Sequence, residues 1–117
     1  ELTEDPQSEI SLIYYPNKDG LEDRIYRIKT ERSGASSMPE PRTTHFTSNL
    51  EILSQSDSEV TLRFNWLTKS YRYKKTAEFF GTSFYTLDVT GDQPLIREKR
   101  MVLNNDCINQ VLDVYHL

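Results

Sequence analysis

The chain has 117 residues and a net charge of −4, with 27% charged and 11% aromatic residues. This length suits one domain with a single core, and the aromatic content excludes a disordered chain. Charges of both signs are interspersed along the chain, which argues against nucleic acid as the main ligand. No apolar run approaches the ~18 residues of a membrane helix. The lone Cys107 excludes an internal disulfide framework and suits a reducing compartment.

The N-terminal half is expected to form one short strand and one helix. The apolar run SEISLIYY at residues 8–15 is typical of a strand and is closed by Pro16. Asp19 offers an N-cap oxygen, with Glu22 following as in a capping box, and apolar residues then recur at helical spacing. A helix is therefore predicted from residue 19 to about residue 31, followed by a loop rich in serine and proline.

The second half is expected to form an antiparallel sheet. Four segments alternate apolar and polar residues and are separated by polar turns: residues 45–53, 60–73, 79–90 and 95–103. The stretch 60–73 is longer than a usual strand, which indicates a bent or twisted central strand. Gly81 predicts a bulge or a close approach of two backbones, and the apolar C-terminal segment is expected to dock onto the rest of the domain.

The two histidines allow several kinds of site. His45 near Asp113 or Asp106 would form an acid–base dyad, and His45, His116 and Asp113 would form a two-histidine-one-carboxylate iron site if the fold brought them together. No pair of histidines or cysteines stands at metal-ligand spacing, however. A histidine that is hydrogen-bonded within a strand or at an interface is the simpler interpretation.

A basic cluster with tyrosines ends the long predicted strand. The cluster consists of Lys69, Arg72, Lys74 and Lys75. It is either a solvated strand end or an anion-binding site, and the solvated strand end is the favoured interpretation. Tyr71 and Tyr73 are out of phase with the apolar face of the strand, so they are expected to point outward. Outward tyrosines beside Arg72 have the composition of a protein interface.

Several segments of the chain also carry a family resemblance. In chain order they are EISLIYYPNKDGLEDRIYRIKTERS, PRTTHFTSN, VTLRFNW with YRYK, FFGTSFYTLD and LNNDCINQVLDVYHL. Together they resemble the small (β) subunit of bacterial aromatic-ring-hydroxylating dioxygenases, in particular those acting on benzoate, toluate or anthranilate. The resemblance runs through essentially all 117 residues.

This resemblance implies a fold and separate roles for the small and the large subunit. The fold would be α+β, a nuclear-transport-factor-2-like cone in which a curved antiparallel sheet wraps around helices. Residues 1–117 would form a single β-subunit domain that lacks the further N-terminal helices with which the family's chains usually begin. The small subunit would supply no catalytic, cofactor or metal-binding residue, because the large subunit carries the Rieske iron–sulfur cluster and the mononuclear iron.

The resemblance also implies an assembly. Three small subunits would form a trimeric base that braces three large subunits in a three-plus-three hexamer in the bacterial cytoplasm. A separate reductase would deliver electrons from NADH to the complex, and the product would be a cis-dihydrodiol. No membrane or nucleic-acid partner is expected.

The residues that match polar positions characteristic of the family are expected to make contacts between subunits or contacts that stabilise the sheet. With the outward tyrosines and their arginine, the predicted interface set is Arg42, His45, Asn49, Tyr71, Arg72, Tyr73, Asp106, Tyr115 and His116. Two alternatives stay open at this point. One is a stand-alone dehydratase or isomerase of the same cone fold that uses His45 and an aspartate, and the other is a homo-oligomeric binding module without a catalytic partner.

Overall fold

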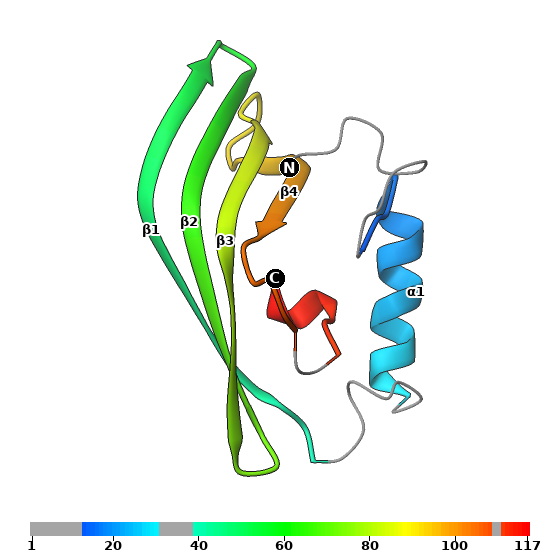
Figure 1. Ribbon diagram of the computed structural model, residues 1–117. Helices are drawn as coiled ribbons and strands as arrows, with labels where there is room; N and C mark the ends of the chain where they lie inside the picture. Colours follow the sequence, from blue (N-terminus) through cyan, green and yellow to red (C-terminus); the bar gives the residue numbers. More distant parts are fainter. Residues whose placement is uncertain (1–12, 31–38, 109–110) are drawn as a thin grey trace.

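The computed structural model describes residues 13–30, 39–108 and 111–117. One helix, α1 (Lys18–Lys29), precedes four strands and a short 3₁₀ helix, η1 (Val114–His116). The strands are β1 (Arg42–Gln55), β2 (Glu59–Arg72), β3 (Lys75–Asp88) and β4 (Leu95–Leu103). They form one antiparallel sheet in the order β1-β2-β3-β4, which is bowed around η1 (Figure 1).

The long central strand β2 begins with apolar side chains at every second position, from Val60 to Trp66, and its buried face continues with Thr68 and Ser70. It pairs with β3 without a register shift, from Glu59 opposite Asp88 to Arg72 opposite Lys75. The prediction of a long strand at 60–73 is therefore confirmed, and the last predicted strand, 95–103, matches β4. The start predicted for the third strand was wrong, because the chain reverses over Tyr73 and Lys74 and β3 begins at Lys75.

The two faces of the sheet differ in burial. The concave face holds the buried residues of the central strands, namely Trp66, Thr68, Ser70, Phe79, Gly81 and Ser83. Gly81 lies where β4 approaches so closely that a Cβ atom would come within 1.8 Å of the carbonyl oxygen of Val102. The predicted close approach at Gly81 is thus confirmed.

On the edge strand β1 the pairing with β2 is interrupted. Register shifts fall between Ser48 and Glu51 and between Ile52 and Ser54. Asn49, in the first of these bulges, has a φ of 56°. Asparagine tolerates this left-handed conformation better than most residues, so its type explains its position in the bulge.

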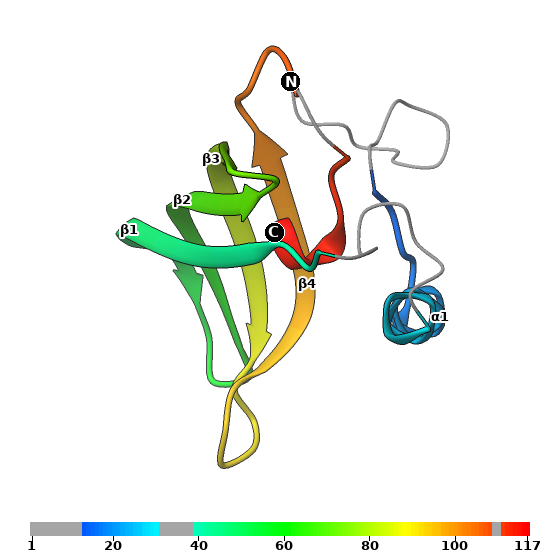
Figure 2. The same ribbon diagram turned by 90° about the horizontal axis from the view of Figure 1, so that it is seen from below.

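Helix α1 lies on the concave side of the sheet, with η1 between them (Figures 1 and 2). The N-cap is Asn17, whose Oδ1 accepts the backbone N–H of Asp19 at 2.9 Å, so the predicted cap at Asp19 was wrong. The predicted strand at 8–15 lies largely outside the described residues, and residues 13–15 are not in a strand. None of the helices in the described part of the chain is long and apolar enough to cross a membrane.

Candidate functional site

The C-terminal turn carries two deeply buried ionisable side chains. Asp113 and His116 are only 1% and 2% exposed. The carboxylate of Asp113 accepts the backbone N–H of Val114 at 2.7 Å, and Nδ1 of His116 accepts the backbone N–H of Asp113 at 2.9 Å. The Asp113 side chain also accepts the backbone N–H of His116, so these two residues bond each other reciprocally in a capping box that fixes η1.

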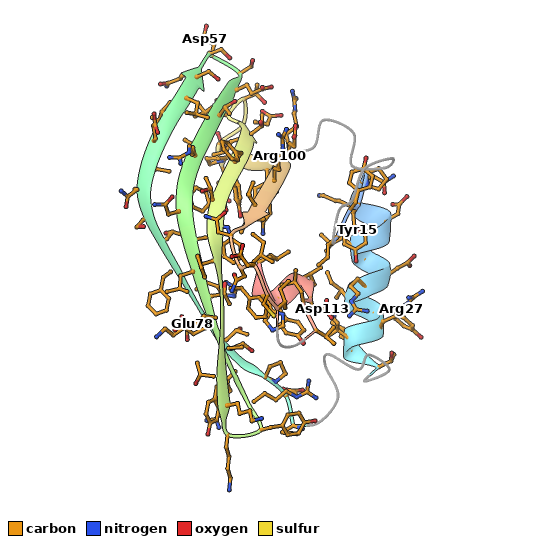
Figure 3. All side chains as sticks on the ribbon, viewed as in Figure 1. Tyr15, Arg27, Asp57, Glu78, Arg100 and Asp113 are labelled. Carbon is orange, nitrogen blue, oxygen red and sulfur yellow. The ribbon has the colours of Figure 1, made fainter. Side chains whose placement is uncertain are left out.

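An ion pair joins this turn to α1. Nε of Arg24 donates to Oδ1 of Asp113 at 2.9 Å, and Nη2 donates to Oδ2, so the contact is bidentate. Figure 3 shows Asp113 between the sheet and the helix. Burial raises the pKa of Asp113, but the hydrogen bonds from Arg24 and Val114 and the charge of Arg24 outweigh it and hold that pKa below its usual value. The carboxylate is therefore ionised and fully engaged.

His116 is held by aromatic rings as well as by the turn. Its ring lies 4.6 Å from the ring of Phe79 and 4.4 Å from that of Tyr115, between centroids. Burial lowers the pKa of His116 to about 4, although the negative charge of Asp113 opposes this shift. At neutral pH the imidazole is uncharged, with Nδ1 accepting and Nε2 protonated.

His45 is placed on β1 beside the same region. Its Nδ1 lies 3.0 Å from Oγ1 of Thr68, its register partner on β2. The carboxylate of Asp113 binds Arg24 rather than the His45 ring, and Asp106 lies exposed beyond the end of β4. Among the described residues, no group of three histidine, cysteine, aspartate or glutamate side chains is arranged to hold a metal ion.

The arrangement of these groups is that of a lock rather than of a reaction centre. Arg24, Asp113 and His116 tie the helix and the C-terminus to the concave face of the sheet. Two surface hollows of the described chain lie elsewhere, one against α1 and one beside the β3–β4 connection, and neither is lined by a histidine. We call Arg24, Asp113, Tyr115 and His116 the interior lock.

A second group of predicted residues meets at the β2–β3 hairpin. The guanidinium of Arg42 lies 5.1 Å from the ring centre of Tyr71, its register partner. Arg72 lies 4.8 Å from the ring centre of Tyr73 and donates to its hydroxyl at 3.2 Å. Tyr71 and Tyr73 are 40% and 62% exposed, so the predicted outward position of both tyrosines is confirmed. Cation–π contacts thus join each arginine to a tyrosine.

The structure thus divides the predicted residues into two clusters and two separate positions. Arg42, Tyr71, Arg72 and Tyr73 gather at the hairpin, and His45, Tyr115 and His116 lie toward the concave face, whereas Asn49 is in the β1 bulge and Asp106 is apart. The sequence analysis missed Arg24. Its signal was a charged side chain within the apolar stripe formed by Leu21, Ile25 and Ile28.

The convex face of the sheet carries an apolar row that the sequence analysis also missed. Phe46, Leu67 and Phe80 are register neighbours across β1, β2 and β3. Phe46 is 49% exposed and Phe80 44% exposed. In the next row Lys69 and Glu78 form an ion pair at 3.3 Å. Exposed apolar side chains gathered in this way are typical of a protein–protein contact.

These features, a bowed antiparallel sheet around a C-terminal turn and one helix, define a cone of the nuclear-transport-factor-2-like class. The crystal structure of the benzoate 1,2-dioxygenase β subunit from Burkholderia mallei has this fold and aligns with a TM-score of 0.80 at 51% sequence identity, covering 94% of this chain and 71% of that one. The family model described as "Ring hydroxylating beta subunit" matches residues 1–110. The chain belongs to this family of ring-hydroxylating dioxygenase β subunits.

Two relatives show how similar the chain is to particular members. It is 61% identical to the toluate 1,2-dioxygenase subunit beta of Pseudomonas putida over 117 residues, which is all of this chain and 72% of that protein. It is 56% identical to the benzoate 1,2-dioxygenase subunit beta of Acinetobacter baylyi over 117 residues, or 69% of that protein. These relatives support the dioxygenase-subunit interpretation and give no support to a stand-alone dehydratase or isomerase.

Proposed function

We propose that this chain is the structural small subunit of a Rieske-type dioxygenase that dihydroxylates a benzoate-like aromatic acid. The observation that carries the proposal is the 61% identity, along the whole chain, to a toluate 1,2-dioxygenase β subunit. A benzoate 1,2-dioxygenase β subunit follows at 56%. Both named substrates are simple aromatic carboxylates, so the substrate class is an aromatic acid.

The role proposed for the chain is to hold its partners in place. Its buried ionisable groups are already engaged within the fold: Asp113 binds Arg24, and His116 accepts a backbone N–H between two aromatic rings. This use of Asp113 and His116 supports scaffolding over acid–base catalysis. The Rieske cluster and the mononuclear iron would belong to the large subunit, and a separate reductase would deliver the electrons.

The proposed assembly is a hexamer of three large and three small subunits in the bacterial cytoplasm, with the small subunits forming a trimeric base. The exposed apolar row of Phe46, Leu67 and Phe80 supports a subunit that is covered in its complex. The tyrosine–arginine pairs at the β2–β3 hairpin support the same conclusion, because these residue types dominate the energetics of interfaces.

The proposal is tested by reconstituting the oxygenase. The large subunit that the proposal requires is expressed alone and together with the natural small subunit, and benzoate consumption is measured with NADH and the reductase. We expect dihydrodiol formation only when both subunits are present. Full activity of the large subunit alone, or turnover by the small subunit alone, would contradict the scaffold role.

A further inference from the structure

The charges of the sheet gather by sign at its two ends. The β2–β3 hairpin lies at one end, and the β1–β2 and β3–β4 connections lie at the other (Figure 1). At the hairpin end, five cations face two carboxylates. The cations are Arg42, Lys69, Arg72, Lys74 and Lys75, and the carboxylates are Glu40 and Glu78. We call this the basic end.

The opposite end is acidic. Figure 3 shows Asp57 at this end of the sheet. Arg97 binds Glu59 at 3.0 Å and Asp88 at 3.6 Å, and Lys18 lines the same surface hollow as Asp88. Glu98 and Lys99 of β4 lie as near to this end as Glu78 and Lys69 lie to the other, so five carboxylates surround three cations. The carboxylates of this acidic end are Asp57, Glu59, Asp88, Asp92 and Glu98.

Each end has exposed charges to offer to a partner. Lys74 and Lys75 are exposed at the basic end, and Asp57 and Asp92 are exposed at the acidic end. None of the four forms an ion pair with another residue in the part of the chain that the structure describes. The chain as a whole has a charge of −4, so the basic end is a local reversal of the overall sign.

The turn at the basic end is strained. Tyr73 and Lys74 have φ values of 53° and 60°, a conformation that a two-residue hairpin turn normally gives to asparagine and glycine. Backbone strain of this kind is typical of functional positions. The arginine–tyrosine contacts next to the turn hold large side chains in place, which lowers the entropy lost on binding.

We propose that the basic end of one copy binds the acidic end of the next copy and so closes the small-subunit trimer head to tail. The inference rests on the trimer of the proposed function. A three-fold ring has heterologous contacts, in which one patch meets a different patch, so each copy needs two complementary surfaces. The two ends of this sheet are such surfaces. Because the sheet is bowed, its ends do not point along one straight line, as ring closure requires (Figure 1).

The test is a charge-reversal cycle in the natural full-length subunit, co-expressed with its large subunit. One variant combines Lys74→Glu with Lys75→Glu, a second combines Asp57→Lys with Asp92→Lys, and a third carries all four changes. The matched control reverses two exposed charges of α1, Arg27→Glu with Lys29→Glu. Trimer dissociation is followed by native mass spectrometry and sedimentation at ionic strength of about 0.15 M.

Each single-ended reversal places like charges against each other, so we expect it to weaken the trimer by about 100-fold. The four-fold variant restores opposite charges across the same contact and should recover to within about tenfold of the natural protein, because the two ends act as one coupled pair. The α1 control should assemble normally. Thermal unfolding by circular dichroism identifies any variant that is destabilised in its fold.

Two results would overturn the head-to-tail contact while leaving the proposed function intact. The first is a natural three-plus-three complex whose trimer is unchanged by either reversal. The second is weakening that the four-fold variant fails to repair, which would assign the basic end to an acidic surface of the large subunit or to nucleic acid. If the natural subunits form no mixed complex at all, the proposed function fails and the trimer contact fails with it.

Discussion

At the scale of single residues, the interior lock decides how the described chain holds its C-terminus. The sheet buries only Trp66 and Phe79 among the apolar side chains described, so polar groups complete the interior. Buried polar groups are stabilising only when their hydrogen bonds are satisfied. Asp113 satisfies this condition through Arg24 and the N–H groups of η1.

Replacing Arg24 by methionine should destabilise the fold by about 2 kcal/mol, because it leaves the Asp113 carboxylate buried without its cation. The estimate is at the low end for a buried pair because Arg24 is 24% exposed and water can partly replace it. Arg27→Met, on the exposed side of the same helix, is the matched control and should change stability by less than about 0.5 kcal/mol. Urea unfolding measures both, and equal effects would exclude the lock.

His116 should make the fold sensitive to mild acid. Its pKa is about 4 in the folded chain and 6.5 ordinarily, so between these values the unfolded state binds the proton more tightly. Stability is therefore highest above pH 6.5 and falls as the pH is lowered toward 4, by up to about 3 kcal/mol. The Asp113 carboxylate, whose pKa is lowered, adds a further loss at still lower pH.

The variant His116→Gln tests this assignment, since its amide oxygen can still accept the N–H of Asp113 but does not titrate. Urea midpoints measured from pH 7.5 to 4.5 should fall less steeply for this variant than for the natural chain. A slope that keeps its natural value in His116→Gln would show that another group carries the pH dependence.

At the scale of the elements, the closeness of β3 and β4 depends on Gly81. A Cβ at this position would overlap the Val102 carbonyl oxygen and crowd the N–H of Asn104, and both are backbone atoms that cannot rotate away. Gly81→Ala should therefore destabilise the sheet by at least about 3 kcal/mol. Gly91→Ala, in the β3–β4 connection where the nearest atom is 4.0 Å away, should be nearly neutral. Thermal unfolding of the two variants gives the comparison directly.

The β2–β3 turn should be less stable than its sequence could make it. Replacing Tyr73 and Lys74 by asparagine and glycine relieves two left-handed residues and should stabilise the chain by about 1 kcal/mol. The same change removes one tyrosine and one cation from the basic end, so the small-subunit trimer should become weaker. Unfolding and trimer dissociation measured on the same variant separate the effect on the fold from the effect on the trimer. A more stable trimer would contradict the proposed role of the basic end.

The elements differ in how well the sequence predicts them, and the reasons are physical. Strand β2 was predictable because apolar residues recur at every second position from Val60 to Trp66. Strand β4 was predictable because a segment with apolar residues at both ends follows the polar turn at residues 90–92. The turn at Tyr73 and Lys74 was not, because it uses neither glycine nor asparagine. The N-cap of α1 is Asn17 rather than the predicted Asp19. Asparagine and aspartate cap helices about equally well, so the sequence alone does not rank them.

The candidate sites show the same limit. Grouping Arg42 with Tyr71 needs the register of β1 on β2, and that register contains two shifts that no local pattern reveals. The pairing of Arg24 with Asp113 joins residues far apart in the chain, so only the fold brings them together. The exposure of Tyr71 was predictable from its phase in β2, whereas Tyr73 is exposed because it lies in the turn that follows this strand.

At the scale of the whole molecule, the chain presents more contact surface than its own fold uses. It has an exposed apolar row on the convex face of the sheet, a basic end and an acidic end. Membership of the β-subunit family gives these surfaces a common explanation, since a small subunit is a component of a larger enzyme. Under the proposed function, the chain acts through its contacts with other chains rather than through a pocket of its own.

The native mass of the oxygenase is the most direct test of this account. The full-length small subunit is co-expressed with its large subunit, and the intact complex is weighed by native mass spectrometry, with the small subunit expressed alone for comparison. We predict one mixed species with three copies of each subunit. A small subunit that stays a separate stable species and never associates with the large subunit would contradict the scaffold role.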